Sequence, residues 1–572
     1  MMSYPTPPLT PTTSKNPGAE FMIRPKLLNL PTFSQLPTPP LSPDLILSTP
    51  ALEAFKRLSF DQSDRSLSEN ELSYYLPSRA DGVNDMYLHH RLTAPAHKMT
   101  KDRLHVLWAY QLLRHPLLAA YLKVTSYEDV RFVNDTPQSL AETMDQAASR
   151  FAYLGSGSDI VSTYLNGPRT LSNDCLAMLV VAVPETEDGE YEIMLCATHY
   201  LGDGMALHTF MNEFYTLLGS DRSIDDFVAV IEKQLDAPHQ LPASLEERLP
   251  VVGNGSRLAA AIGTEEYRRS EAKLVGGQSF PGSPIKKERH TVVPTLAYSS
   301  DETKKILSAC KGKGVTVAHA IFALCNIAWS RRAQSTIAPC LIYSALNLRP
   351  NMLPSPPTST ATSFFHLAVG YFNIVLPTLL PAIPTADLFW HRARLTKAQT
   401  TRAVKSPFLV SRSRESSRTR AARAIKWARI DDEDAKAASI GLGFGMDVSK
   451  GKASTIEMAP GPKIAPLRAA IETPPLPAVV PNATPAVSQR ALMGVSMLGN
   501  LDAMYKHAAF PDMALKSLTT GSRQRSGGLL LFAYTFQGKL WFSLGYDQNG
   551  FATGVIETFW GDVQNLIDEV LL

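Results

Sequence analysis

The stretch YEIMLCATHYLGDGMALHTFMNEFYTLL, residues Tyr191–Leu218, decides the fold of this chain. Its first part, Tyr191–Thr198, is short, apolar and β-prone, and the turn signal Asp188-Gly189 precedes it. This pattern predicts a buried strand. The last part repeats apolar residues at helical spacing, which predicts an amphipathic helix. The residues expected on the apolar face of that helix are Leu207, Phe210, Met211, Phe214, Leu217 and Leu218.

Between the predicted strand and helix stand His199, Asp203 and Gly204, in the spacing H-x-x-x-D-G. A histidine at the end of a buried strand can have one ring nitrogen fixed by the backbone and the other free to take a proton. Asp203 can brace the loop, and Gly202 and Gly204 permit a tight turn and close approach of a ligand. One interpretation of the pattern is therefore a catalytic histidine at His199.

Two other interpretations of the motif are open. A structural histidine that caps the strand has the same position in the sequence. A metal pair at i and i+4 needs a helix at this place, which Gly202 and Gly204 disfavour, and no third ligand lies nearby in the sequence. We therefore expect no metal, and the place of the motif between a strand and an amphipathic helix favours catalysis.

At these residues the sequence resembles the acyl-CoA-dependent acyltransferase superfamily, which includes chloramphenicol acetyltransferase, plant BAHD and fungal trichothecene acyltransferases, and peptide-synthetase condensation domains. H-x-x-x-D-G is the catalytic motif of that family, and the resemblance runs with gaps from about Met86 to the C-terminus. It implies an α/β fold of two chloramphenicol-acetyltransferase-like subdomains, each a mixed sheet flanked by helices, with an active-site tunnel between them. It also implies that His199 is the general base and that Asp203 is structural.

The resemblance extends to two later segments. Arg349 follows a predicted strand at Leu341–Leu346, at the position where the family has an arginine that pairs with the motif aspartate. The alternative is an exposed arginine at a strand end. The segment VSMLGN at 495–500 resembles the family's S-N-x-G segment, although Met497 replaces the asparagine, and implies an oxyanion-holding role for Ser496. The D-F-G-W-G motif of the plant enzymes is absent.

Composition excludes several classes of function. Lys+Arg 56 against Asp+Glu 53 leaves a net charge of +3, too balanced for a general nucleic-acid or membrane surface. The five cysteines form no C-x-x-C pair and lie mostly in or beside apolar segments, which predicts buried free thiols and a cytoplasmic location. The sequence has no run of eighteen apolar residues and no apolar signal-peptide core, so we expect no membrane span.

The predicted domain organisation has a tail and two halves. Residues 1–48 carry the near-repeats PTPPLTP and PTPPLSP and are expected to be a disordered tail, with a phosphosite or a proline-binding ligand as the alternative. Residues 49–280 form the predicted N-terminal subdomain with the H-x-x-x-D-G motif, and residues 281–572 the C-terminal one. A partly disordered surface insertion is expected at 411–490. Its basic run, Arg412–Arg429, alternatively contacts CoA phosphates.

Further elements are predicted by local pattern. A helix around Trp108 ends at Pro116, with His115 as a surface or capping residue, and the long helix after Gly314 places His319 in the core or an interface. The remaining predictions are a strand at Cys175–Val183 paired with Tyr191–Thr198, a capping box at Ser299, a strand at Leu367–Pro377, a hairpin of Leu529–Phe536 and Lys539–Tyr546, and a helix at Val555–Leu571.

The function implied by the resemblance is transfer of an acyl group, expected to be acetyl, from CoA to a hydroxyl of a small molecule. Acyl-CoA is then a co-substrate, and no cofactor is bound permanently. The Pro- and Ala-rich insertions suggest a fungal enzyme of secondary metabolism or glycolipid synthesis. We also expect a monomer. The alternatives are a condensation-type enzyme with a carrier-protein donor and a catalytically inactive binding protein with the same fold. The intact motif together with Arg349 speaks against the inactive protein.

Overall fold

The computed structural model describes residues 64–155, 159–185, 189–236, 240–251, 256–285, 287–354, 363–442 and 490–572. The predicted tail at 1–48 and the part of the predicted insertion from 443 to 489 lie outside the described residues.

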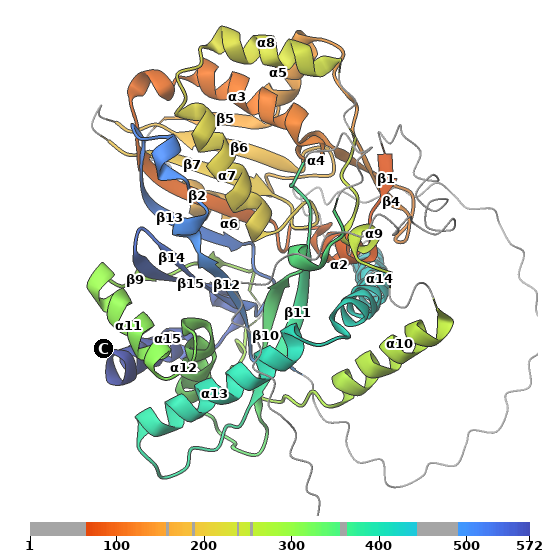
Figure 1. Cartoon of the computed structure of the whole chain (residues 1–572). Helices are drawn as coiled ribbons and strands as arrows, with labels where there is room; N and C mark the ends of the chain where they lie inside the picture. The colour runs from red at the N-terminus through yellow and green to blue at the C-terminus, as the bar shows by residue number, and fades with distance from the viewer. Residues whose placement is uncertain are drawn as a thin grey trace, which may run out of the picture. The chain divides into compact units, whose positions relative to one another are not determined.

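The first sheet has five strands in the order β13-β2-β7-β6-β5 (Figure 1). β6 and β7 pair antiparallel, which confirms the predicted pair of strands that leads into the motif. The edge strand β13 comes from the C-terminal part of the chain and pairs antiparallel with β2. The C-terminal half therefore completes the sheet of the N-terminal half. The strands are β2 (Met86–Thr93), β5 (Phe151–Leu154), β6 (Ala177–Ala182), β7 (Tyr191–Ala197) and β13 (Ala514–Ser522).

Helices cover both faces of this sheet. On one face α7 packs with α3, whose Leu104, Leu107 and Trp108 are completely buried in the first core. The short helix α6 (Ile160–Asn166) packs on the other face, against Tyr87 and Cys196. The helices of the first face are α3 (Lys101–Arg114), α4 (Pro116–Ala119), α5 (Leu140–Ala148), α7 (Gly204–Leu218) and α8 (Ile224–Leu235).

The second sheet has seven strands. Its order is β11-β10-β12-β14-β15-β8, and β9 also pairs with β15. β12 runs parallel to both β10 and β14, and the other pairs are antiparallel, so the sheet is mixed as predicted. The strands are β8 (Thr291–Val292), β9 (Thr295–Ala297), β10 (Cys340–Asn347), β11 (Val369–Leu376), β12 (Met493–Asn500), β14 (Leu529–Phe536) and β15 (Lys539–Asp547).

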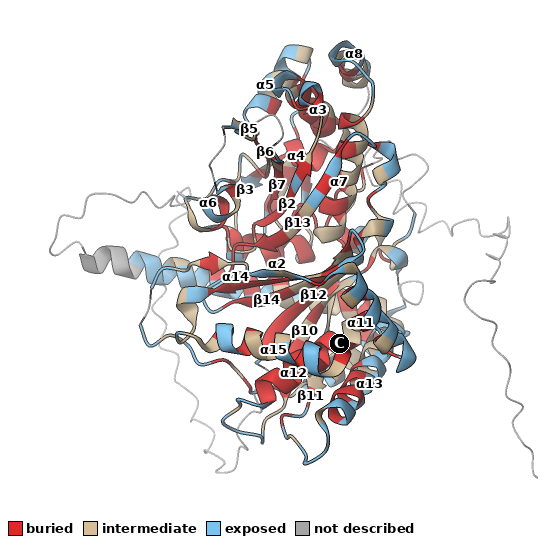
Figure 2. Ribbon diagram, turned by 90° about the vertical axis from the view of Figure 1, so that its left-hand side faces the viewer, coloured by how far each residue is buried: buried red, intermediate tan, exposed pale blue. Residues whose placement is uncertain are grey.

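The two faces of the second sheet differ in burial, as alternation along strands requires. One face carries Ile342, Ile374 and Val495, which are completely buried under α11, α12, α13 and α15 (Figure 2). On the other face Tyr371 and Phe532 are half-buried and pack toward the first core. The four covering helices are α11 (Ser300–Gly312), α12 (Val317–Ser330), α13 (Thr385–Val404) and α15 (Val555–Leu571).

Most of the predicted elements of this half are confirmed. The Ser299 side chain accepts a hydrogen bond from the Glu302 N–H, which is the predicted capping box at the start of α11. Gln537 and Gly538, with φ of 55° and 67°, join β14 and β15, as a two-residue hairpin turn requires.

The cysteines of both halves are free thiols. Cys196, Cys310, Cys325 and Cys340 are buried, and Cys175 is half-buried.

The basic run Arg412–Arg429 is not a solvated loop. It belongs to α14 (Leu409–Leu442), which packs against α2 (Glu69–Ser78) and α10 (Arg257–Ala272). Several buried residues of α14 are small, which allows close helix packing between the arginines. The surface insertion expected at 411–490 stays a prediction, and its basic start forms this helix, whose many charges made the stripe of small residues hard to recognise in the sequence. The buried members of the stripe are Ser413, Ser417, Ala421, Ala424 and Ala428.

Two histidines also differ from expectation. His115 is the C-cap residue of α3, as one alternative had it, but it is completely buried and its Nδ1 lies 2.9 Å from Ser363 Oγ. His319 is not a core residue: its Nδ1 accepts from the Thr316 N–H at 3.1 Å and caps α12. Pro116 explains the first case, because it starts a new helix that turns His115 inward.

Acid is expected to destabilise the fold through its buried histidines. Burial lowers the pKa of His115 and His208 to about 3, and that of His90 well below its usual value. An unfolded histidine titrates near 6.5. The stability due to these neutral histidines is therefore complete above pH 6.5 and is lost as the pH falls toward 3, at about 1.4 kcal/mol per pH unit for each.

Chemical denaturation at pH 7 and pH 5 measures this loss. We expect His208→Leu to lower the difference in unfolding free energy between the two pH values by about 2 kcal/mol, because one titrating group is removed. His97→Gln, at an exposed position, is the matched control and is expected to leave the difference unchanged. Equal pH dependence in the wild-type protein and His208→Leu would contradict the assignment.

Candidate active site

His199 lies two residues after the end of β7, in the turn that leads into α7. Its Nδ1 is 3.1 Å from the carbonyl oxygen of Gly202. A neutral imidazole with its proton on Nδ1 donates to this carbonyl, which leaves the lone pair on Nε2. The side chain is half-buried, so it is not sealed in the core. The local backbone thus fixes one ring nitrogen and leaves the other able to accept a proton.

The environment of His199 keeps it neutral. Burial lowers its pKa below the usual value, and the positive charge of Arg420 acts in the same direction. The carboxylate of Asp203 and the Gly202 carbonyl offset only part of this effect. The ring of Tyr74, from α2, stacks on the imidazole with ring centres 4.2 Å apart and an angle of 24° between planes. A base that is neutral at physiological pH can accept a proton.

Asp203 is held by bonds to three elements. It caps α7 by accepting from the Ala206 N–H at 3.2 Å, and it accepts from the Ala368 N–H, just before β11, at 2.8 Å. Arg349 Nη1 donates to both carboxylate oxygens, at 2.8 and 2.9 Å. These bonds use the carboxylate oxygens to hold the start of α7 to the segments that flank β10 and β11. Asp203 therefore holds these three segments together.

The pKa of Asp203 is lowered more by its partners than it is raised by burial. Burial by itself raises the pKa of this carboxyl group, but the charge of Arg349 and the N–H of Ala368 lower it further, so the net pKa lies below the usual value. Arg349 begins the short helix η3 (Arg349–Asn351) and also donates to the His366 carbonyl at 2.7 Å. The predicted pairing of Asp203 with Arg349 is thus present in the structure.

Gly202 and Gly204 of the motif allow neighbouring side chains to pack closely against the backbone. They are not needed for a left-handed turn, since neither has a positive φ. A Cβ on Gly202 would lie 2.9 Å from Cε1 of the buried Phe365. Gly204 is the first residue of α7, and a Cβ there would lie 3.1 Å from the tip of Leu498 on β12. The turn of the motif is therefore packed against both the region before β11 and the end of β12.

Gly202→Ala is expected to lower the free energy of unfolding by about 1–3 kcal/mol, because the methyl group meets a ring that has no room to move. Gly204→Ala is the matched comparison: it meets the end of a flexible side chain, and alanine suits a helix better than glycine. Thermal or denaturant unfolding of the two variants measures the difference. Equal stability of the two variants would contradict the packing argument.

Ser496 lies on β12, in register with Phe532 of β14. Its neighbours Val495 and Met497 pack into the second core, so by alternation Ser496 is on the face that looks toward the first core. It is half-buried, and the strand is irregular between Met497 and Gly499. Its role in holding an oxyanion stays a prediction.

Sequence reasoning missed three residues around His199. Tyr74 lies upstream of the segment in which the resemblance begins, and its hydroxyl hydrogen-bonds to that of Tyr371 on β11. Arg420 of α14 lies over both rings, with its guanidinium carbon 4.8 and 4.6 Å from their centres. The sequence Gly370-Tyr371-Phe372-Asn373, a glycine–aromatic–asparagine pattern familiar from the resembling family, is a signal that could have found Tyr371. Tyr74 and Arg420 gave no local signal, because only the fold brings α2 and α14 to the motif.

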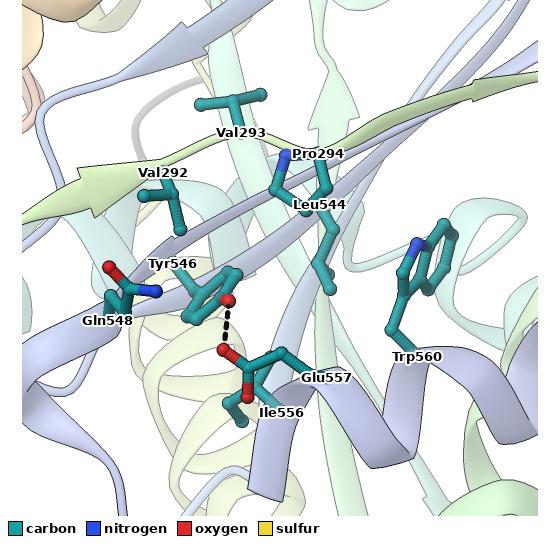
Figure 3. A pocket seen from close by; sticks show the side chains of 9 residues that line it. All are labelled: Val292, Val293, Pro294, Leu544, Tyr546, Gln548, Ile556, Glu557 and Trp560. Carbon is teal, nitrogen blue, oxygen red and sulfur yellow. Dashed lines mark hydrogen bonds between the residues drawn. The ribbon is translucent and has the colours of Figure 1, made fainter. Parts of the chain in front are cut away.

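A separate cavity of about 480 Å³ lies between the β8–β9 segment and α15 (Figure 3). Its wall includes the Tyr546 hydroxyl, which donates to Glu557 at 2.7 Å, and the Trp560 ring. None of its lining residues is a predicted site residue, so the tunnel expected at His199 stays a prediction.

In the described parts of the chain, no group of three or more metal-ligating side chains could hold a metal ion, and no helix is long and apolar enough to cross a membrane.

No protein-family model matches this sequence, and no curated protein sequence matches it. Solved structures do match. Trichothecene 15-O-acetyltransferase of Fusarium sporotrichioides is 12% identical, with a TM-score of 0.64 over 88% of this chain and 95% of that one. The condensation domain of the monacolin K polyketide synthase is 10% identical, with a TM-score of 0.52 over 88% and 97%. The first condensation domain of the CDA synthetase is 12% identical, with a TM-score of 0.51 over 88% and 94%.

Structural similarity at sequence identities of 10–12% establishes the fold but not the substrate. The matches cover nearly the full length of each relative, so they compare whole folds rather than one shared motif. They agree with two mixed sheets flanked by helices, as the strand orders show. The chain has the α/β fold of chloramphenicol-acetyltransferase-like proteins and condensation domains.

Proposed function

We propose that this protein is an acyl-CoA-dependent O-acyltransferase with His199 as its general base. The observation that carries the proposal is the bond from His199 Nδ1 to the Gly202 carbonyl, which leaves Nε2 to take a proton. The Asp203–Arg349 pair supports it, because that pair fixes the turn in which His199 lies. Acyl-CoA is a co-substrate, and the acceptor is a small molecule with a hydroxyl group.

The reaction needs no covalent enzyme intermediate. His199 Nε2 takes the proton of the acceptor hydroxyl as its oxygen attacks the thioester carbonyl carbon. The tetrahedral intermediate then collapses, the C–S bond breaks, and the CoA thiolate leaves and takes the proton from the imidazolium. Ser496 is the proposed donor to the oxyanion, from its place on the inner face of the second sheet.

The acyl group and the acceptor are proposed by analogy. The matched Fusarium protein is described as a 15-O-acetyltransferase of a trichothecene, which favours acetyl transfer to a hydroxyl of a secondary metabolite. A glycolipid acceptor is the other proposal made from the sequence. We propose that the chain works as a monomer in the cytoplasm.

The experiment is mass spectrometry of products after incubation with a panel of acyl-CoAs and a metabolite extract. A product heavier than its acceptor by one acyl group, formed only with acyl-CoA and enzyme, supports the proposal. No product with any donor contradicts it.

The second candidate is a condensation-type enzyme, favoured by the matches to condensation domains. The same acyl group offered on a carrier protein distinguishes it, because that enzyme takes the carrier-bound donor and leaves acyl-CoA unused.

A further inference from the structure

The hydrogen bond to Gly202 fixes one atom of the His199 ring but not the plane of the ring. Nδ1 lies 3.1 Å from the Gly202 carbonyl oxygen. A hydrogen bond tolerates a range of angles, so the imidazole could still tilt about the line that joins these two atoms. Nε2 is on the far side of the ring, and its lone pair lies in the ring plane. The direction in which the base takes a proton therefore depends on a second contact.

Tyr74 makes that second contact. Its ring is stacked on the imidazole of His199, with ring centres 4.2 Å apart and 24° between the planes. A tilt of the imidazole would press one edge into the phenol ring and lift the other edge away, so the contact resists it. Tyr74 is buried, and it belongs to the helix α2 rather than to a loop. The plane of the imidazole is thus set from a rigid element.

Tyr74 is held in turn by two other segments. Its hydroxyl group and that of Tyr371, on β11, hydrogen-bond to each other. The guanidinium carbon of Arg420, on α14, is 4.8 Å from the ring centre of Tyr74 and 4.6 Å from that of Tyr371. A cation over an aromatic face is attracted to it. The ring that stacks on the imidazole is therefore fixed at its hydroxyl end and over its π-system.

Asn70 ties the same three segments together one helical turn before Tyr74. Its amide oxygen accepts a hydrogen bond from Arg420 Nη1 at 3.1 Å, and its amide nitrogen donates to the Val369 carbonyl at 3.0 Å. The Asn70 side chain is almost completely buried. Because α2 is joined to α14 and to β11 at this point, the position of Tyr74 relative to the motif is well determined.

The next residue of α2 provides an internal comparison. Tyr75 meets Tyr200 edge to face, with ring centres 5.4 Å apart and planes at 90°. Two successive residues of α2 therefore contact two successive residues of the motif turn. Tyr74 stacks on the imidazole, whereas Tyr75 packs on the residue that follows it. Both tyrosines are buried, so their contributions to packing are comparable.

We propose that Tyr74 is a positioning residue for His199, whose ring sets the plane of the imidazole and so the direction of Nε2. Tyr74 acts through the base and is not given a contact with substrate. The proposal rests on the proposed function, because it assigns a role in the same reaction. Its consequence is an effect on the proton transfer step and not on the binding of either substrate.

Steady-state kinetics of three variants test the role. Tyr74→Leu is expected to lower kcat by about 10–100-fold, since a misdirected base loses much of its effect, with the KM of both substrates unchanged. Tyr74→Phe keeps the stacked ring and should retain most of kcat. Tyr75→Leu is the matched control: it removes a buried ring from the same helix and should leave kcat close to the wild-type value. Equal losses of kcat in Tyr74→Leu and Tyr75→Leu would contradict the proposal, because α2 would then act only as a scaffold.

Proton NMR of the His199 ring gives a readout that needs no turnover. The Hε1 signal is assigned by its absence from His199→Ala. An aromatic face moves the signals of protons stacked over it to lower frequency. We therefore expect this signal at lower frequency in the wild-type protein, Tyr74→Phe and Tyr75→Leu than in Tyr74→Leu. If Tyr74→Leu does not fold, Tyr74→Met replaces it, because the flexible methionine side chain adapts to the space that the ring leaves.

The proposal is overturned if the Hε1 signal stays in place in the aliphatic variant, or if the signal moves while kcat is unchanged. The first of these results is obtained even from a protein that transfers no acyl group. Near-wild-type turnover by His199→Ala marks the separate failure of the proposed function, so the two failures are distinguishable.

Discussion

Replacement of His199 by alanine is expected to lower the rate of acyl transfer by about 10²–10⁴-fold, the range that general-base catalysis contributes. The loss should appear in kcat, because the imidazole acts on the acceptor hydroxyl in the transition state. Affinity for CoA should survive, since the base does not hold the donor. The side chain is half-buried and makes one hydrogen bond, to Gly202, so the variant should remain folded.

The pH dependence of the wild-type rate provides a second readout of the same residue. Burial lowers the pKa of His199, so the base is neutral above its usual value of about 6.5 and becomes protonated only at lower pH. The rate is therefore expected to be constant above pH 6.5. It should decrease only when the pH is lowered past this value, toward the lowered pKa of His199. His97→Ala, at an exposed position, is the control for loss of a histidine and should leave the rate unchanged. A rate that rises as the pH falls below 6 would exclude a neutral base.

Asp203→Ala is expected to lower the free energy of unfolding by about 1.5–3 kcal/mol, because it removes the buried partner of a charge-assisted ion pair with the partly exposed Arg349. The reason is that Arg349 keeps its charge, and the N–H groups of Ala206 and Ala368 lose their acceptor. Turnover should fall as well, because the turn that holds His199 is no longer fixed. Denaturant unfolding together with kcat measures both effects.

Arg418→Ala gives the comparison, since it removes an arginine from an exposed ion pair with Glu415. Exposed pairs contribute about 0–1 kcal/mol, so this variant should be close to the wild-type protein in stability. Equal stability of Asp203→Ala and Arg418→Ala would show that Asp203 is not a brace.

The structural features that could be predicted from the sequence are those that local pattern and residue spacing determine. The strand β7, the helix α7 and the hairpin of β14 and β15 each follow from periodicity and turn residues inside one segment. The position of Arg349 opposite Asp203 came from the family resemblance, and the ion pair is present in the structure. These features depend on short stretches or on one matched motif.

What the sequence missed depends on long-range packing. β13 joins the first sheet across more than four hundred residues, and nothing in its own pattern names β2 as its partner. The basic helix α14 appeared as a solvated insertion because its charges outnumber its small buried residues. Arg420 and Tyr74 reach His199 only through that packing, so the composition of the site around the base could not be predicted.

The most direct test of the account is a side-by-side measurement of released CoA thiol and acylated product with the wild-type protein and His199→Ala, given one responsive acyl-CoA and acceptor. The account predicts one thiol released per acyl group transferred by the wild-type protein, and almost no product from a folded His199→Ala that still binds CoA. Near-wild-type product from His199→Ala would contradict the account and leave His199 as a structural histidine at the end of a strand.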